Sequence, residues 1–578
     1  MKKKDLDLSM INKMRKICAG GFLWLISFSA DAQLNPYQYN NTKQINASSA
    51  AVVSAHALAS DAGLQVMKQG GNAFDAAIAT QLALAVVYPG AGNIGGGGFL
   101  VGHLSNGKNI AIDFRETAPA KSSKDMYLDS SGNPIKSLSL EGRFASGVPG
   151  TVAGLFTTLK YAKLPFSKLI SPAIQLAEKG FSLTAAQAED FNDSRDIFLK
   201  MNKNKIAFVK STPWKTGDVL IQKDLANTLK RIRDKGAAGF YEGETARLMV
   251  NEMRSGNGII SKNDLKNYKS KEREVMQFPY KDLQVITMPL PSSGGIILAQ
   301  LLKMTEKKNL ASLPFQSAES VQLITEAERR AFADRAEFAG DPDFVKVPVK
   351  TLVSDAYLQK RMEDYTPGKA GSSKIIGAGN IHESDQTTHI SIADAEGNAV
   401  SVTTTLNDHF GSKTVITGAG FLMNNEMDDF SVKSGEPNMY GAVGNDKNAI
   451  APGKRMLSSM TPTIILKNNK PYIVVGTPGG TTIPTSIFQT LVNLIEYKLS
   501  ASDAVNKPRF HHQWLPDQIQ VEKDFPRNTR EKLIEMGYVI KERSNYGRTE
   551  LLQITYSKKG KKISAVADKR GDDDARGY

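Results

Sequence analysis

The sequence predicts an α+β protein, because helical and strand-like patterns occupy different parts of the chain. Residues 54–89 and most of 150–345 show apolar residues at helical spacing, whereas alternating strand-like segments dominate after residue 386. The chain has 578 residues, of which 41% are hydrophobic and 23% are charged, and this composition is typical of globular proteins. It is therefore long enough to bury a sizeable core.

The first 32 residues have the pattern of an exported protein's leader. A basic stretch precedes an apolar segment at 17–30, which is too short to span a bilayer comfortably. Ala30-Asp31-Ala32 supplies the small residues of a signal-peptidase site, so we expect a signal peptide at 1–32 and a periplasmic or secreted protein. The alternative is an N-terminal anchor that is never cleaved. Cys18 is the only cysteine, so the mature chain is expected to lack disulfides and thiolate sites.

Residues 54–89 predict two helices separated by a glycine stop at Gly70-Gly71. Asn72 is suited to cap the second helix, which Pro89-Gly90 terminates. This second helix is apolar nearly all round, so we expect it to be buried. The glycine-rich segment 90–98 follows a helix and precedes a strand, which is the wrong order for a dinucleotide-binding fingerprint. We interpret it as a loop that packs closely against other backbone.

The middle of the chain, about 150–345, is predicted to be mostly helical, with a clear helix at 317–338 and a loop at 289–296. Residues 368–386 are rich in Gly and Ser and predict an exposed or mobile connection. Strand-like segments begin directly after it. This change is the main boundary that the sequence indicates.

Residues 387–407 predict a β-hairpin, because two alternating segments flank Asp394-Ala395-Glu396-Gly397. Gly397 is suited to the left-handed position of the turn. If Asp394 pairs with Asn398, the register places Thr387 opposite Thr405 at the open end of the hairpin. Threonine is common in strands for packing reasons alone, so the residues themselves favour a structural role.

Ten short segments occur in one order along most of the mature chain: 70–80, 93–101, 113–119, 147–155, 291–296, 386–389, 402–407, 424–430, 457–464 and 476–480. In this order they resemble the γ-glutamyltransferase family of N-terminal nucleophile hydrolases. Each segment is weak evidence alone, but ten in the family's order are specific. The resemblance changes the interpretation of Thr387 from a packing residue to a nucleophile.

The resemblance implies a four-layer αββα sandwich made as an inactive precursor. The precursor would be cut between Gln386 and Thr387 into a large subunit, 33–386, and a small subunit, 387–578, which together form one unit. Cleavage converts the Thr387 amide into an α-amine with a pKa near 8, which can take the proton of its own hydroxyl. Thr405 matches the second threonine of the family, which supports the nucleophile through hydrogen bonds.

The resemblance also assigns the pocket for a γ-glutamyl group. Arg115, Ser458 and Ser459 match residues that bind the α-carboxylate, for which a planar guanidinium is a two-pronged donor. Asn407, Glu426 and Asp429 match acceptors around the α-ammonium. Gly479 and Gly480 match the backbone donors of the oxyanion hole. Tyr440 lies in a segment, 434–446, that resembles a lid loop.

The expected function is therefore a γ-glutamyltransferase and glutathione hydrolase without a cofactor, transferring the group to water, amino acids or short peptides. The alternatives are a glutaryl acylase of the cephalosporin type, a polyglutamate depolymerase, and a non-catalytic binding relative. The formal charge of +14 suggests nucleic acid, but the basic residues are scattered, so we expect no such partner. Asp428 and Asp429 lack a third ligand at suitable spacing, so we expect no metal. His389 follows the nucleophile, but no serine elbow accompanies it, which excludes a serine triad.

Overall fold

The computed structural model describes residues 34–376, 387–435, 445–544 and 546–578. Residues 35–578 form one compact unit. The predicted signal peptide, Gln386 and Tyr440 lie outside the described residues. No helix among the described residues is long and apolar enough to cross a membrane.

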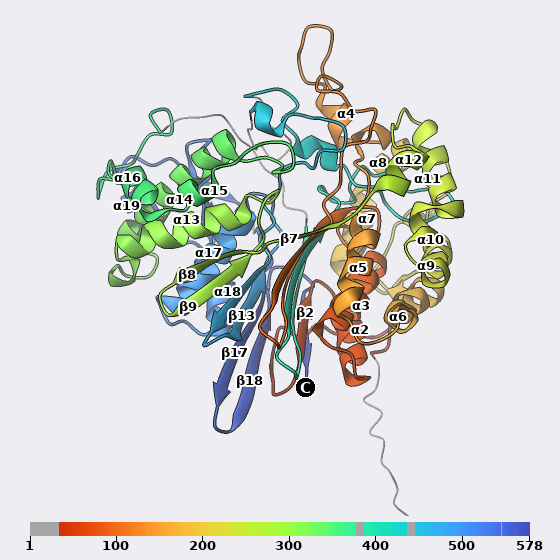
Figure 1. Ribbon diagram of the computed structural model, residues 1–578, viewed down its shortest axis with the longest axis horizontal. Coiled ribbons are helices and arrows are strands. Elements are labelled where there is room, and N and C mark those ends of the chain that lie inside the picture. Colours follow the sequence, from red (N-terminus) through yellow and green to blue (C-terminus); the bar gives the residue numbers. More distant parts are fainter. Residues whose placement is uncertain (1–33, 377–386, 436–444, 545) are drawn as a thin grey trace, which may run out of the picture. The chain divides into compact units, whose positions relative to one another are not determined.

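Two seven-stranded sheets pack face to face at the centre of the molecule (Figure 1). The nucleophile sheet contains, in spatial order, β19 (Asp574–Gly577), β2 (Ala51–Ser54), β10 (Thr388–Ala393), β11 (Ala399–Thr405), β3 (Gly97–His103), β4 (Asn109–Asp113) and β7 (Lys271–Arg273). The second sheet contains β1 (Gln44–Ala47), β18 (Gly560–Ala567), β17 (Glu550–Ser557), β13 (Lys470–Gly476), β12 (Thr463–Lys467), β9 (Leu283–Thr287) and β8 (Met276–Tyr280). Neighbouring strands within both sheets are antiparallel.

Helices cover the outer face of each sheet (Figure 1). The nucleophile sheet is covered by α2 (Ala57–Lys68), α3 (Ala73–Val87) and α5 (Thr151–Thr158), with α6 (Phe166–Lys179) packed on α3. The second sheet is covered by α13 (Gly294–Lys307), α14 (Ala318–Phe338), α17 (Thr482–Ile495) and α18 (Ala501–Asn506). The predicted αββα sandwich is therefore confirmed.

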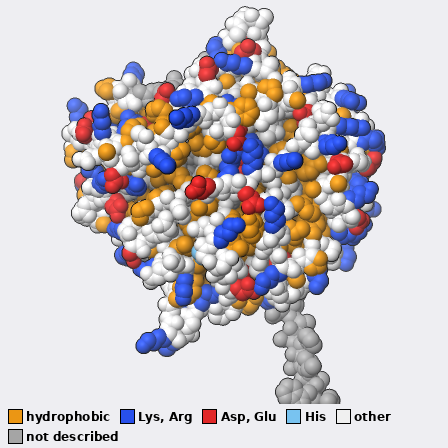
Figure 2. Space-filling view, in the orientation of Figure 1, with side chains coloured by type: hydrophobic (Ala, Val, Ile, Leu, Met, Phe, Trp, Pro, Cys, Tyr) orange, Lys and Arg blue, Asp and Glu red, His pale blue; other side chains and the backbone are white. Residues whose placement is uncertain are grey.

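Shorter elements surround these four layers. They are α4 (Lys136–Leu140), β5 (Phe181–Ser182), α7 (Ala185–Asp193), α8 (Arg195–Met201), β6 (Val219–Leu220), α9 (Lys223–Lys235), α10 (Ala238–Tyr241), α11 (Gly243–Arg254), α12 (Lys262–Asn267), α15 (Val349–Leu352), α16 (Asp355–Arg361), β14 (Phe510–His511), β15 (Ile519–Glu522), α19 (Arg527–Glu535) and β16 (Ile540–Arg543). On the face shown in Figure 2, Lys and Arg are interspersed with Asp and Glu, as the scattered basic residues of the sequence predict.

The predicted helices at 54–89 are confirmed as α2 and α3. Asn72 caps α3 by accepting hydrogen bonds from the backbone N–H groups of Phe74 and Asp75, and the Asp75 carboxylate accepts one from the Asn72 N–H. Every residue of α3 is buried, as its apolar sequence predicted. The helix expected at 317–338 is also present as α14, with Ser317 as its cap.

Apart from the small sheet of β14, β15 and β16, the strands after residue 386 share their sheets with strands from before it. Strand β10 pairs with β2 and β11 pairs with β3, so strands from both sides of the predicted boundary alternate in one sheet. The sequence also did not predict the strands β8 and β9, within the region expected to be mostly helical, or the helix α17 in the strand-like region. Strands β8 and β9 are only five residues each, which is too short for a clear period.

Candidate active site

The hairpin of β10 and β11 has the predicted register. Thr388 faces Thr404 and Ala393 faces Ala399, so the next pair toward the open end is Thr387 and Thr405. Asp394 closes the turn, because its Oδ1 accepts hydrogen bonds from the backbone of Glu396 and Asn398, each at 2.9 Å. Gly397 has φ = +97°, which is the positive value that the turn requires. Local sequence therefore brings the two threonines to the same end of the sheet.

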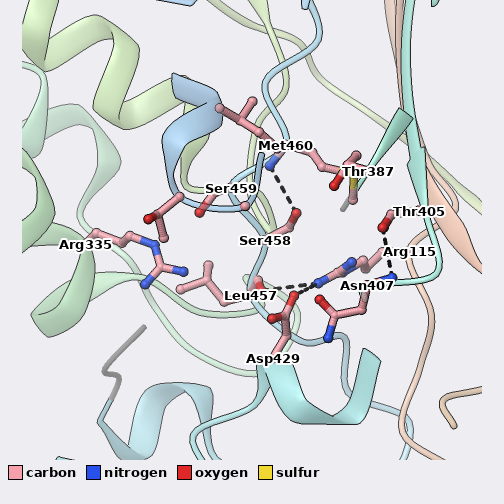
Figure 3. Close-up of a pocket in the computed structure, with 13 residues that line it drawn as sticks. Arg115, Arg335, Thr387, Thr405, Asn407, Asp429, Leu457, Ser458, Ser459 and Met460 are labelled. Atoms are coloured by element: carbon pink, nitrogen blue, oxygen red, sulfur yellow. Dashed lines mark hydrogen bonds and ion pairs between the residues drawn. The ribbon is translucent and has the colours of Figure 1, made fainter. Parts of the chain in front are cut away.

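Thr387 and Thr405 line one cavity (Figure 3). Its wall consists of Arg115, Arg335, Thr387, Thr405, Asn407, Asp429, Leu457, Ser458, Ser459, Met460, Gly480, Thr481 and Ile483. Both threonine side chains are largely buried. The backbone N–H of Asn407 donates to Thr405 Oγ1 at 2.8 Å, which fixes the orientation of that hydroxyl. Asn407 itself has φ = +79°, so the chain turns sharply just after β11.

The glycine-rich segment 90–98 supports the end of β11. A Cβ on Gly96 would lie 2.1 Å from the carbonyl oxygen of Thr405, so only glycine fits there. Asn93 Nδ2 donates to the same carbonyl at 2.8 Å. The interpretation of this segment as a backbone-packing loop is confirmed.

Arg115 lies two residues beyond β4 and is 1% exposed. Its guanidinium forms ion pairs with Glu426 (Nη1 to Oε2, 2.5 Å) and with Asp429, and Glu116 lies 3.9 Å away. Glu426 and Asp429 belong to one 3₁₀ turn, Glu426–Asp429. The sequence assigned Arg115 to a carboxylate and the two acids to an ammonium. The structure places these opposite charges in direct contact.

Three carboxyl groups surround Arg115, which is more than one guanidinium could neutralise if all of them were ionised. Burial raises the pKa of Glu116 to about 8, and it raises the pKa of Glu426 well above its ordinary value. Burial also raises the pKa of Asp429, while Arg115 opposes that shift. A cation beside these carboxyl groups would favour their ionised forms. The cluster therefore suits a ligand that has both a carboxylate and an ammonium.

Ser458 and Ser459 are held against the loop at 289–296. The Ser458 N–H donates to the Pro291 carbonyl at 2.9 Å, and the Ser293 N–H donates to the Ser458 carbonyl at 2.8 Å. Ser458 Oγ also accepts from the Met460 N–H at 3.1 Å. The last three residues of this predicted loop are the first turn of α13. Helix α13 thus fixes the serine pair on the cavity wall.

Gly479 and Gly480 precede α17, whose cap is Thr481. Both have positive φ (+132° and +54°), and a Cβ on Gly479 would lie 2.4 Å from Thr482 Oγ1. Gly480 lines the cavity and Gly479 is its neighbour in the chain. The amides at a helix N-terminus carry partial positive charge, which favours a developing oxyanion.

Known proteins are similar to this chain over most of its length. The family profile described as Gamma-glutamyltranspeptidase matches residues 59–578. The chain belongs to the γ-glutamyltranspeptidase family. It is 45% identical over 515 residues to the glutathione hydrolase proenzyme of Escherichia coli, covering 88% of this chain and 89% of that protein.

Two solved structures extend the comparison. The γ-glutamyltranspeptidase of Helicobacter pylori is 45% identical with a TM-score of 0.56, covering 59% of this chain and 97% of that chain. The cephalosporin acylase of Bacillus halodurans is 25% identical with a TM-score of 0.80, covering 95% of this chain and 99% of that chain. The γ-glutamyltranspeptidase family and the N-terminal nucleophile hydrolase fold predicted from the sequence are confirmed.

Most of the residues that the sequence singled out in this γ-glutamyltranspeptidase lie together. Thr387, Thr405, Arg115, Asn407, Asp429, Ser458, Ser459 and Gly480 line the cavity, and Glu426 contacts Arg115 from behind it. Gln386 and Tyr440 lie outside the described residues.

The sequence missed Glu116 and Arg335. Glu116 directly follows Arg115 in the chain. Its side chain is fully buried, which the sequence alone could not indicate. Arg335 lies in the last turn of α14, where all but three residues of the helix are buried. The sequence carried one indication of a role for Arg335. The predicted helix contains several charged residues, and charges on a helix that becomes buried need partners.

Proposed function

We propose that the chain is a self-cleaving γ-glutamyltransferase and glutathione hydrolase. In this proposal the precursor is cut between Gln386 and Thr387, giving a large subunit, 33–386, and a small subunit, 387–578, that stay associated. The interleaving of β2, β10, β11 and β3 supports their association, because separating the subunits would break a continuous sheet. We also propose export from the cytoplasm after removal of residues 1–32.

The chemistry begins at Thr387. The Thr387 hydroxyl attacks the Gln386 carbonyl, and collapse of the tetrahedral intermediate breaks the Gln386–Thr387 amide bond, which frees the α-amine and leaves an ester on Thr387 Oγ1. Water then hydrolyses this ester, which gives the Gln386 carboxylate and restores the Thr387 hydroxyl. That amine then takes the hydroxyl proton as Thr387 Oγ1 attacks the γ-carbonyl of the donor. The amide N–H groups of Gly479 and Gly480 stabilise the oxyanion, and the leaving amine departs with a proton. Water or the amine of an amino acid or short peptide then attacks the ester.

One observation carries the substrate assignment: Thr387 and the Arg115–Asp429 pair line the same cavity. A γ-glutamyl donor presents its α-carboxylate to Arg115, Ser458 and Ser459, and its α-ammonium to Asp429, Glu426 and Asn407. The α-carboxylate would therefore pair with Arg115 and the α-ammonium with Asp429, in place of the direct contact between these two side chains. A glutaryl group lacks the ammonium and would leave the excess acids unmatched, which argues against the acylase alternative.

The test uses purified wild-type protein and two variants, Thr387→Ala and Asp429→Asn. On a denaturing gel we expect two bands for the wild type and one band for Thr387→Ala, which should have no activity. With paired anilides, the wild type should release aniline from the γ-glutamyl substrate much faster than from the glutaryl substrate. Asp429→Asn should lose most of that preference.

Two results would contradict the proposal. A soluble wild-type protein that stays as a single band would remove the self-cleavage step. Equal use of both anilides by the wild type would remove the ammonium-binding assignment of Asp429 and favour a general acylase.

A further inference from the structure

Asn448 adjoins the cavity wall without lining it, at the end of the short 3₁₀ turn Asp446–Asn448. It is 5% exposed, and both ends of its side-chain amide are bonded. Nδ2 donates a hydrogen bond to the Asp429 carbonyl at 2.7 Å, and Oδ1 accepts one from the Leu457 N–H at 3.0 Å. Asparagine suits this position, because its side chain offers a donor and an acceptor on one planar group.

The two backbone groups that Asn448 binds belong to segments with opposite tasks in the proposed γ-glutamyl pocket. Asp429 ends the 3₁₀ turn Glu426–Asp429, which supplies proposed acceptors for the α-ammonium. Leu457 directly precedes Ser458, which is assigned to the α-carboxylate. The Asn448 side chain is therefore a bridge, one residue long, between the ammonium side and the carboxylate side of the pocket.

The backbone around Asn448 is held as well as its side chain. The Asn448 carbonyl accepts a hydrogen bond from the Ser431 N–H at 2.9 Å. The Lys454 ammonium donates to the carbonyls of Lys447 and Ala449, the two chain neighbours of Asn448, at 2.7 and 2.9 Å. The bridge thus starts from a fixed point, so it can hold the two segments at a set distance.

The α-carboxylate and the α-ammonium of a γ-glutamyl group are attached to the same carbon atom, so the donor fixes the distance between them. The pocket has to present its own groups at the matching spacing, because a misplacement of about 1 Å can cost up to about a hundredfold in rate. Resting on the proposed function, we propose that Asn448 is a positioning residue that sets this spacing. It acts through Asp429 and Ser458, and it determines the selectivity for donors that carry both charges.

The experiment compares the wild type with Asn448→Asp and Asn448→Leu. Asn448→Asp keeps an acceptor for the Leu457 N–H but places a carboxylate oxygen against the Asp429 carbonyl, whereas Asn448→Leu removes both bonds at similar volume. For a γ-glutamyl anilide, kcat/KM should fall about tenfold in Asn448→Asp and about thirtyfold in Asn448→Leu, since the loss of one or two buried hydrogen bonds misplaces the pocket.

Two readouts separate positioning from general damage. The loss should appear mainly in KM, with kcat within about threefold of wild type, because Thr387 and the amides of Gly479 and Gly480 are not bound by Asn448. For a glutaryl anilide, which has no ammonium to place, kcat/KM should fall by less than about threefold. The preference for the γ-glutamyl donor should therefore decrease, while self-cleavage into two bands continues.

Asn202 provides a matched control, because it is a buried bridge of the same kind at another place. Its Nδ2 donates to the Lys413 carbonyl at 2.8 Å, and its Oδ1 accepts from the Val415 N–H at 2.9 Å. Asn202 is 9% exposed, and neither of its partners lines the cavity. Asn202→Asp and Asn202→Leu should lower the unfolding temperature about as much as the changes at Asn448 but keep the wild-type KM and donor preference.

Each outcome supports or contradicts the inference. If the variants at Asn448 and Asn202 have the same KM and donor preference, or if the loss at Asn448 lies in kcat alone, Asn448 has only a structural role. Should Asn448→Leu fail to give soluble protein, Asn448→Asp decides, since it retains the bond to Leu457. Failure of both Asn448 variants to self-cleave, with normal cleavage of the Asn202 variants, would also contradict the inference.

Failure of the proposed function would look different. A wild type that cleaves neither anilide, or that uses both equally, would overturn the γ-glutamyl assignment itself. A wild type that strongly prefers the γ-glutamyl anilide, together with Asn448 variants that keep this preference, would overturn only the inference about Asn448.

Discussion

Thr387 separates two polar regions of opposite character. On the cavity side, Arg115 lies among Glu116, Glu426 and Asp429. Between the sheets, His389 contacts three hydroxyls: Thr403 (2.9 Å), Ser391 (3.2 Å) and Ser401 (3.4 Å). We call the first region the charged cluster and the second, formed by His389, Ser391, Ser401 and Thr403, the neutral layer.

The neutral layer connects β10 and β11 to the second sheet, including β13, the strand that leads to Gly479 and Gly480. Ser401 Oγ donates to the Val475 carbonyl at 3.1 Å, and Ser391 Oγ donates to the Glu550 carbonyl at 2.9 Å. Burial lowers the pKa of His389 to about 3, so its imidazole is neutral at ordinary pH. The ionic groups thus lie at the cavity wall and directly behind it, whereas neutral hydrogen bonds connect the two sheets.

The largest expected effect is on the charged cluster. Arg115→Gln leaves Glu116, Glu426 and Asp429 without their cation and removes the proposed donor to the α-carboxylate, so kcat/KM for a γ-glutamyl anilide should fall about a thousandfold, equivalent to about 4 kcal/mol. Arg115→Lys should recover only part of the loss, because it cannot donate in the same fork. Activity of Arg115→Gln within tenfold of wild type would show that this cluster does not bind the substrate.

The next largest effect is expected in the neutral layer, when an added side-chain atom at Gly476 crowds the His389 ring. A Cβ on Gly476 would lie 2.1 Å from His389 Cε1, so Gly476→Ala should lower the free energy of unfolding by about 2 to 3 kcal/mol. Denaturant unfolding is best compared in the Thr387→Ala background, where the chain is expected to stay in one piece. The control variant carries the same change together with His389→Ala, which removes the ring that the added Cβ would meet, so the loss caused by Gly476→Ala should be much smaller there. An equal loss with and without the His389 ring would show that His389 does not require the close approach.

The two regions should also respond to pH in opposite directions. His389 stays neutral in the folded protein down to a pKa of about 3, while the unfolded chain binds a proton below about 6.5. The free energy of unfolding should therefore decrease as the pH falls, with about 2 kcal/mol of this loss due to His389 between pH 6.5 and 5. His389→Gln should reduce that slope when unfolding is measured at several pH values. An unchanged slope would mean that His389 is accessible to protons in the folded state.

Glu116 gives the smallest effect, with the opposite sign. Its folded pKa is about 8, so the folded protein keeps a proton that the unfolded chain releases above about pH 4.5. Its contribution to the free energy of unfolding should decrease as the pH rises between these values, by about 1 kcal/mol from pH 6 to 7. Glu116→Gln should remove this decrease in the same denaturant series. If the variant shows the wild-type slope, Glu116 is ionised in the folded protein.

The sequence predicted local features of these regions better than their contacts. The hairpin register followed from alternation and the turn at Asp394–Gly397, because pairing within a hairpin depends on adjacent residues. Arg115, Glu426 and Asp429 could be assigned only through the family resemblance, because they are far apart in sequence. Their direct ion pairing, the protonation of Glu116 and the position of Arg335 depend on burial, which no local pattern specified.

The N-terminal sequence of the small fragment shows where the precursor is cut, and so tests the proposed self-cleavage at Thr387. We expect Thr-Thr-His-Ile, beginning at Thr387, and we expect this fragment and the activity to appear together during processing. A fragment beginning at another residue, or full activity in a chain that is still intact at Thr387, would contradict the account.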